Sequence, residues 1–164
     1  MSRRETSNLS EHLTAIARLT PDRKAAICPL GKSSNWVHLT YAELDREVNR
    51  YSYGLVEAGI GKGTTTILMM RPSLEFFCTA IALLRVGAKI VLIDPGMGIR
   101  RMACSLSEVE AEAFIGIPLA HMMRVIYHSS FRTVKVNVTA GRRWFWGGRG
   151  GQPRRTHVPR RLLP

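Results

Sequence analysis

The chain has few cysteines, and their spacing argues against two classes of small protein. Cys28, Cys78 and Cys104 give an odd count and no Cys-x-x-Cys pair. Such a set favours neither a disulfide framework nor a tetrahedral zinc site. Cys78 falls in an apolar run with helical periodicity, so we expect a buried, unreactive thiol there.

Long uninterrupted hydrophobic runs are also missing. The first residues are polar and lack the apolar core of a secretory signal. The longest apolar stretch, residues 76–93, is interrupted by Arg85, Gly87 and Lys89, which makes it too short and too charged to cross a bilayer. We therefore expect no membrane span and a cytoplasmic location.

Familiar catalytic signatures are absent from the sequence. Neither His-Glu-x-x-His nor the nucleophile elbow Gly-x-Ser-x-Gly occurs. The histidines are scattered rather than paired, at His12, His38, His121, His128 and His157. His121 lies near the start of an expected helix, where we expect a packed or partly exposed side chain rather than a catalytic one.

Acidic residues are missing from the last third of the chain. Residues 1–112 hold 14 Lys and Arg against all 12 Asp and Glu, whereas residues 113–164 hold 10 basic residues and no acid. The formal charge of +12 therefore lies almost entirely in the second part. Residues 141–164, with seven arginines and almost no aliphatic residue, cannot bury enough surface to fold, so we expect a folded domain over 8–140 and a disordered basic tail.

The first half of the chain predicts two helices and a hairpin. Spacing of i, i+4 and i+7 at Leu9, Leu13 and Ile16 predicts one apolar helical stripe, ended by Pro21. Residues 25–28 and 36–39 read as a small hairpin. A capping box formed by Thr40 and Glu43 opens the next helix, which ends at Gly59. Its buried stripe is expected at Leu44, Val48, Tyr51 and Leu55.

The rest of the folded region alternates strands and helices. We expect strands over 64–70, 90–93, 113–117 and 133–138, the last at a sheet edge, and helices from Pro72 to Gly87, over 99–106 and over 119–127. In the helix that follows Pro72, the inward positions are expected to be Leu74, Phe77, Ile81 and Leu84. This alternation predicts an α/β fold with a doubly wound, mostly parallel sheet.

Three polar or glycine-rich positions are candidates for a site, and each has a plain structural alternative. Residues 59–64 (Gly-Ile-Gly-Lys-Gly-Thr) lack the spacing of a phosphate loop and follow a helix, so we favour a connector with a solvated Lys62. Asp94 follows a strand expected to be central, where open sheets bind ligands, but its carboxylate also suits a turn. Arg71 ends the preceding strand and could attract an anion or simply be solvated.

Two sequence boxes resemble the start of the adenylate-forming enzymes, the AMP-dependent acyl-CoA synthetase and ligase superfamily. They are residues 39–44 (Leu-Thr-Tyr-Ala-Glu-Leu) and 84–95 (Leu-Arg-Val-Gly-Ala-Lys-Ile-Val-Leu-Ile-Asp-Pro). Residues 92–98, 112–121 and 143–148 are most similar to the branch that acts in olefin biosynthesis, the β-lactone synthetases. The resemblance covers residues 8 to about 147.

The resemblance implies ATP-dependent and magnesium-dependent activation of a carboxylic acid as an acyl-adenylate. The family's Ser/Thr/Gly-rich phosphate loop, its adenylate site and its lid lysine do not occur in this sequence. We therefore assign no catalytic, cofactor-binding or metal-ligating residue, and expect an incomplete fatty acyl or β-hydroxy acid ligase that binds no cofactor and is inactive alone. The family is enzymatic, but the catalytic motifs are missing.

After Gly148 the sequence departs from the family pattern. Residues 151–159 resemble nothing in it, and a shifted reading frame is our hypothesis, which the downstream DNA read in three frames checks. Two alternatives stay open: an RNA-binding or protein-binding module that uses the Arg-rich tail around Trp144-Phe145-Trp146, and a regulatory fragment that pairs with a full-length homologue. We also expect self-association, since a lone subdomain exposes apolar surface.

Overall fold

The computed structural model describes residues 8–29, 36–93, 109–126 and 131–140. The helix expected over 99–106, Asp94 and the tail 141–164 lie outside the described residues. The described elements are α1 (Leu9–Leu19), β1 (Lys24–Pro29), β2 (Trp36–Thr40), α2 (Tyr41–Glu57), β3 (Thr65–Met69), α3 (Leu74–Arg85), β4 (Lys89–Leu92), β5 (Ala113–Gly116), α5 (Pro118–Ile126) and β6 (Val136–Thr139).

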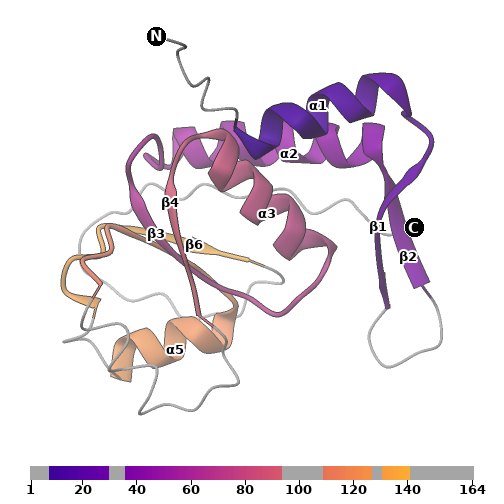
Figure 1. Ribbon diagram of the computed structural model, residues 1–164. Coiled ribbons are helices and arrows are strands. Elements are labelled where there is room, and N and C mark those ends of the chain that lie inside the picture. Colours follow the sequence, from indigo (N-terminus) through magenta and orange to yellow (C-terminus); the bar gives the residue numbers. More distant parts are fainter. Residues whose placement is uncertain (1–7, 30–35, 94–108, 127–130, 141–164) are drawn as a thin grey trace, which may run out of the picture.

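The strands form two separate sheets. β1 and β2 pair antiparallel as the expected hairpin, and the other four strands form a fully parallel sheet in the order β4-β3-β5-β6. Helices α2 and α3 lie on one side of this sheet and α5 on the other (Figure 1). The α/β, doubly wound prediction is therefore confirmed.

Alternation along the central strands creates the two cores. Leu68 and Ile115 point towards α2 and α3, whereas Ile67, Met69 and Phe114 belong to the cluster on the α5 side. All five side chains are buried. The apolar runs of β3 and β5 thus serve both faces, as expected for strands covered by helices on each side.

Helix α2 begins where its sequence signal places it. The Thr40 backbone N–H donates to Glu43 Oε2 at 2.8 Å, and the Glu43 N–H donates to Thr40 Oγ1 at 3.3 Å, so the predicted capping box is present. The buried face carries the four residues of the expected stripe, Leu44, Val48, Tyr51 and Leu55. After the helix, Gly59 takes a φ of 90°, a conformation that costs glycine little.

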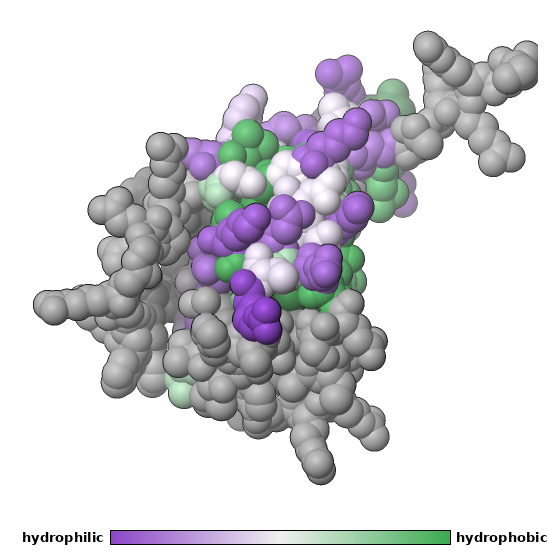
Figure 2. All heavy atoms as spheres, turned by 90° about the vertical axis from the view of Figure 1, so that its left-hand side faces the viewer, coloured by the Kyte–Doolittle hydropathy of each residue, from purple (hydrophilic) through white to green (hydrophobic). Residues whose placement is uncertain are grey.

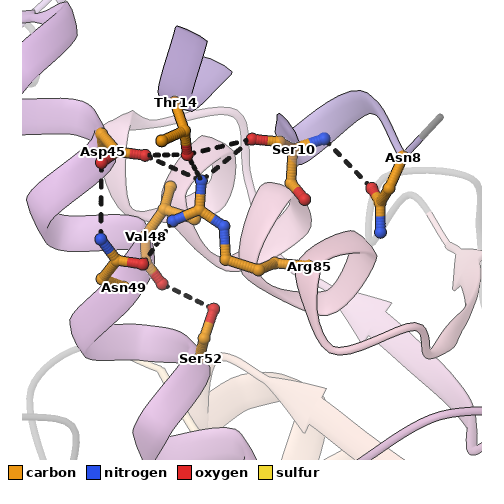
Figure 3. Close-up of polar contacts among 8 residues, drawn as sticks. All are labelled: Asn8, Ser10, Thr14, Asp45, Val48, Asn49, Ser52 and Arg85. Atoms are coloured by element: carbon orange, nitrogen blue, oxygen red, sulfur yellow. Dashed lines mark hydrogen bonds and ion pairs between the residues drawn. The ribbon is translucent and has the colours of Figure 1, made fainter. Parts of the chain in front are cut away.

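Helices α1, α2 and α3 meet at the side chain of Arg85 (Figure 3). Its guanidinium lies 2.8 Å from Asp45 Oδ1 and donates to the Asn49 side-chain oxygen at 2.6 Å, both on α2. It also donates to the Ser10 carbonyl at 3.1 Å and to Thr14 Oγ1 at 3.0 Å on α1. One side chain of α3 therefore holds α1 and α2 together.

Two predicted apolar stripes were partly wrong. Of the three residues in the expected stripe of α1, Leu13 is buried, while Leu9 and Ile16 are 64% and 39% exposed. In α3 the expected inward Phe77 is 42% exposed, and the buried positions are Cys78, Thr79, Ala82 and Leu83. Apolar residues occur all round α3, so their spacing did not identify which side would meet the sheet.

Strand β4, which precedes Asp94, was expected to be central, and that expectation was wrong. Among the described residues β4 pairs only with β3, so it lies at an edge of the sheet. Its residue Leu92 is 63% exposed. The order of strands depends on pairing between residues far apart in the chain. The apolar run in β4 therefore does not predict whether this strand lies at the centre or at the edge of the sheet.

Candidate functional site

The strand order locates the candidate site at the carboxyl ends of β3 and β5. From β3 the chain goes to β4 on one side, but β5 and β6 lie on the other side of β3. Helix α3 follows β3 and α5 follows β5, on opposite faces of the sheet. In open α/β sheets, ligands bind in the crevice at such a reversal.

On the β3 side, the chain turns into α3 immediately after the strand. Arg71 follows β3 and is exposed, as a solvated rim residue would be. The Ser73 hydroxyl accepts the Phe76 N–H at 3.1 Å and caps the first turn of α3. This hydroxyl is engaged by the helix, which leaves the Arg71 guanidinium as the exposed polar group of the β3 end.

On the β5 side, the packing is tight enough to require glycine. A Cβ on Gly116 would lie 2.8 Å from Phe114 Cζ and 3.0 Å from Ala120 Cβ. The Phe114 ring has little freedom to move away, because it packs edge-on against both His121 and Phe131 with centroid distances of 5.0 and 5.3 Å. Gly116 therefore allows α5 to start directly against its own strand.

His121, on α5, joins the end of β6 to that helix. Its Nε2 lies 3.1 Å from the Val138 carbonyl oxygen and 3.2 Å from Thr139 Oγ1. Because a carbonyl only accepts, Nε2 carries the proton in this contact. The packed, partly exposed position agrees with the expectation from the sequence, but no sequence pattern predicted the contacts with Val138 and Thr139.

A small cavity of about 10 Å³ lies on the other face, at the carboxyl ends of β5 and β6. That volume is close to the least that one water molecule requires. Its walls come from α2 and α3 and from the two strands: Tyr51, Leu55, Glu75, Thr79, Ile115, Val138, Thr139 and Ala140. Sequence reasoning counted Tyr51 only as a core residue and missed this cavity altogether.

Burial and nearby carboxylates raise the pKa values of two groups around this cavity. Burial raises the pKa of Tyr51, and the charge of Glu75 raises it further. Burial also raises the pKa of Cys78 to about 12, with Glu47 as the largest charge contribution. Glu47 is buried and pairs with Arg50 at 2.5 Å, one turn along α2. At neutral pH the Cys78 thiol is thus protonated, as expected for an unreactive cysteine.

The glycine-rich residues 59–64 form a connector, as expected, and their backbone is occupied. The Gly61 N–H donates to Thr64 Oγ1 at 3.1 Å, and the Gly63 N–H donates to the Gly87 carbonyl at 2.8 Å. Lys62 between them is exposed. A phosphate cradle needs free N–H groups that converge on one point, and these two are already bonded within the chain.

The connector lies where α2 leads into β3, on the side of the molecule that Figure 2 turns to the viewer. Hydrophilic side chains cross the middle of this face, and apolar ones form separate islands beside them (Figure 2). The carboxyl-end site lies at the opposite end of the strands, so Lys62 and Arg71 do not share a site.

Within the described part of the chain, no three His, Cys, Asp or Glu side chains gather as metal ligands would. No helix there is long and apolar enough to cross a membrane. Asp94, the strongest polar candidate from the sequence, lies outside the described residues. The edge position of β4 also separates the strand before Asp94 from the reversal between β3 and β5.

An open, doubly wound sheet with a reversal at its carboxyl edge defines a class of proteins that bind ligands at that edge. A model of the AMP-binding enzyme family matches residues 13–143. The match covers well over half of the chain, so the chain belongs to the AMP-binding enzyme family. The resemblance inferred from the two sequence boxes is therefore confirmed.

Two curated relatives in this family are olefin beta-lactone synthetases. The chain is 41% identical over 147 residues to an olefin beta-lactone synthetase of Stenotrophomonas maltophilia, covering 86% of this chain and 26% of the relative. An olefin beta-lactone synthetase of Xanthomonas campestris is 40% identical over 146 residues, with the same coverage. The chain thus spans about a quarter of the length of these relatives.

Solved structures show the same fold. The N-terminal domain of FACL13 from Mycobacterium tuberculosis superposes with a TM-score of 0.67 at 25% identity, covering 82% of this chain and 34% of that domain. A long-chain-fatty-acid-CoA ligase from Archaeoglobus fulgidus gives a TM-score of 0.72 at 19% identity, covering 82% of this chain and 27% of that protein. This chain matches the N-terminal region of adenylate-forming ligases.

Proposed function

We propose that this chain supplies the amino-terminal scaffold of an AMP-forming ligase that activates a fatty acyl or β-hydroxy acid. The observation that carries the proposal is the 41% identity to an olefin beta-lactone synthetase over 86% of this chain. In a complete enzyme of this kind, a carboxylate oxygen attacks the α-phosphorus of ATP, which gives an acyl-adenylate and releases pyrophosphate.

We further propose that this chain does not catalyse that reaction alone. A triphosphate with magnesium requires several converging donors and at least one ligand for the metal. Of the described residues, those at the carboxyl ends of β3 and β5 offer the exposed Arg71, while the Ser73 hydroxyl is engaged as a helix cap. The Gly61 and Gly63 N–H groups are bonded within the connector. These residues do not fit magnesium-bound ATP.

The test is a pyrophosphate-release assay on the purified chain with ATP, magnesium and a long-chain β-hydroxy acid. We expect release equal to that of a blank without protein. The matched positive control is the full-length Stenotrophomonas maltophilia relative, assayed at the same molar concentration with the same acid. Acid-dependent release by the chain alone, abolished by omitting the acid, would refute the proposed inactivity.

A second candidate function is favoured by charge: binding of single-stranded RNA through residues 141–164. Residues 113–164 carry 10 basic and no acidic residues, and a Trp-Phe-Trp run lies among the arginines at 142–149. Fluorescence anisotropy with a labelled oligonucleotide measures the affinity. RNA binding predicts a steep loss of affinity between 50 and 200 mM salt, roughly a hundredfold or more for several phosphate contacts, and its disappearance when residues 141–164 are deleted. Weak, salt-insensitive binding eliminates this candidate.

A further inference from the structure

Helix α1 is attached to the rest of the fold by a narrow face. It packs against α2 and α3 on the side that points away from the parallel sheet (Figure 1). The buried residues of α1 are Ser10 and Leu13, so one apolar side chain of this helix is fully covered. Helix α2, by contrast, buries all four apolar residues of its stripe. Burial of apolar surface therefore contributes less to the attachment of α1 than to that of α2.

Hydrogen bonds to Asp45 and Arg85 hold much of the same face of α1 (Figure 3). The Thr14 hydroxyl donates to Asp45 Oδ1 at 2.8 Å and accepts from the Arg85 guanidinium at 3.0 Å. The same guanidinium donates to the Ser10 carbonyl at 3.1 Å. Asn8, which caps the start of α1, donates its side-chain N–H to a backbone carbonyl of α3 at 2.6 Å. Polar contacts thus take the place that apolar packing has in α2.

An open groove runs beside these polar contacts. It has a volume of about 360 Å³ and is lined by one side of α1 and by Arg85. That volume holds several water molecules. The side chains of Arg85 and Asp45 are 16% and 18% exposed, so water reaches both. Because water competes for hydrogen bonds, these contacts hold α1 less firmly than they would in a dry interior.

The turn that follows α1 is anchored separately. The Arg23 carbonyl accepts the Tyr41 N–H at 3.0 Å, and the Pro21 carbonyl accepts the Ala42 N–H at 3.1 Å. These bonds tie the turn to the start of α2 and do not involve the side chains that hold α1 itself. Helix α1 can therefore separate from α2 and α3 about residues 20–23, while the hairpin and the parallel sheet keep their pairing.

We propose that α1 is a detachable helix, which opens from α2 and α3 without unfolding of the parallel sheet and is held closed by the contacts of Thr14 with Asp45 and Arg85. Proteins open locally in cooperative units, most easily where few apolar contacts are buried. Opening uncovers the Asp45–Arg85 pair and the surface against which Leu13 packs. It is a property of the three helices and does not depend on the proposed enzymatic function.

Hydrogen–deuterium exchange of the full-length chain, followed by mass spectrometry, measures this opening. In the wild type, we expect the backbone N–H groups of residues 13–19 to be at least tenfold less protected from exchange than those of β3 and β5. Low concentrations of urea should change the exchange of α1 little, because a local opening exposes little surface, and should accelerate that of the strands steeply. Equal protection and equal urea dependence in α1 and the strands would overturn the proposal.

Substitutions in α1 and α2 test which contacts hold the helix closed. T14V keeps the branched shape of the side chain and removes its hydroxyl group, so exchange in α1 should accelerate about fivefold or more. D45N removes the charge that faces Arg85 and should accelerate it roughly tenfold or more. D22N is the matched control, since Asp22 is exposed in the turn after α1, and should leave exchange in α1 within twofold of the wild type. Equal exchange of α1 in the wild type, T14V and D45N would contradict the assigned contacts.

A substitution in the other core separates local opening from global unfolding. G116A crowds Phe114 on the α5 side of the sheet, far from the contacts of α1. It should accelerate exchange in β3 and β5, which depends on global unfolding, and leave exchange in α1 within twofold of the wild type. Acceleration of α1 and the strands by the same factor in G116A would mean that α1 opens only when the whole fold does, and the proposal would be refuted.

Discussion

Arg85 provides the sharpest test of how this fold is held together. It bonds to α1 and α2 from the end of α3, and its side chain and that of Asp45 are only 16% and 18% exposed. Removing one member of a buried ion pair costs about 3–5 kcal/mol, whereas an exposed pair contributes about 0–1 kcal/mol. For this partly covered pair we expect R85M to cost about 2–3 kcal/mol of unfolding free energy.

Urea denaturation followed by circular dichroism measures this loss. With a slope of about 2 kcal/mol per molar urea, the unfolding midpoint should fall by about 1–1.5 M. R18M is the matched control, because Arg18 is exposed on α1 and should shift the midpoint by less than about 0.3 M. R85K should recover only part of the loss, since lysine lacks the planar fork that reaches two helices.

A double-mutant cycle with D45N completes the test. If Asp45 and Arg85 act as a pair, the double variant should lose clearly less stability than the sum of the two single variants. Additive losses, or a midpoint in R85M equal to that of R18M, would refute the view that Arg85 joins the three helices.

Four further outcomes follow from individual contacts. E43Q should be less stable than the wild type at pH 7, because the hydrogen bond from the Thr40 N–H lowers the pKa of the Glu43 carboxyl from 4.5. That advantage is present above pH 4.5 and is lost as the pH falls through the lower folded-state pKa, so acid titrations of the two proteins should converge. G116A should cost about 1–3 kcal/mol through crowding with Phe114, and an unchanged thermal midpoint would contradict the packing. Because Cys78 is buried, folded C78S and the folded wild type should show the same number of thiols that react with Ellman's reagent. After unfolding in urea, the wild type should show one more reactive thiol than C78S. L92K should reduce self-association in sedimentation velocity, because Leu92 is exposed on the edge strand β4; unchanged association would place the contact elsewhere.

Local signals predicted the parts of the fold that depend on neighbouring residues. In α2 the sequence predicted the capping box at Thr40 and Glu43 and the buried stripe that includes Val48. Both predictions were possible because residues with capping side chains begin the helix, a glycine follows it, and apolar residues lie along one face. Phe77 was assigned to the wrong face because α3 is apolar on most sides. Tertiary packing, which the spacing does not reveal, buries Cys78 against the sheet and leaves Phe77 partly exposed. Leu9 was also assigned to a buried face from the spacing of apolar residues in α1, but it is exposed, because tertiary packing decides which positions are covered.

The candidate site was predicted less well, because it depends on the order of strands. Asp94 was singled out on the assumption that β4 is central, but the reversal lies between β3 and β5. The connector at residues 59–64 was predicted because its position between a helix and a strand can be read from local sequence, and its Gly61 and Gly63 N–H groups bond within the chain. The contact of His121 with Val138, 17 residues away, left no local signal.

Both outer strands of the parallel sheet, β4 and β6, pair on one side only within the described part of the chain. Such a sheet can be lengthened at either border without disturbing the pairing already made between β3 and β5. A protein several times larger could therefore be assembled around this unit by addition, and the order β4-β3-β5-β6 would persist unchanged inside it.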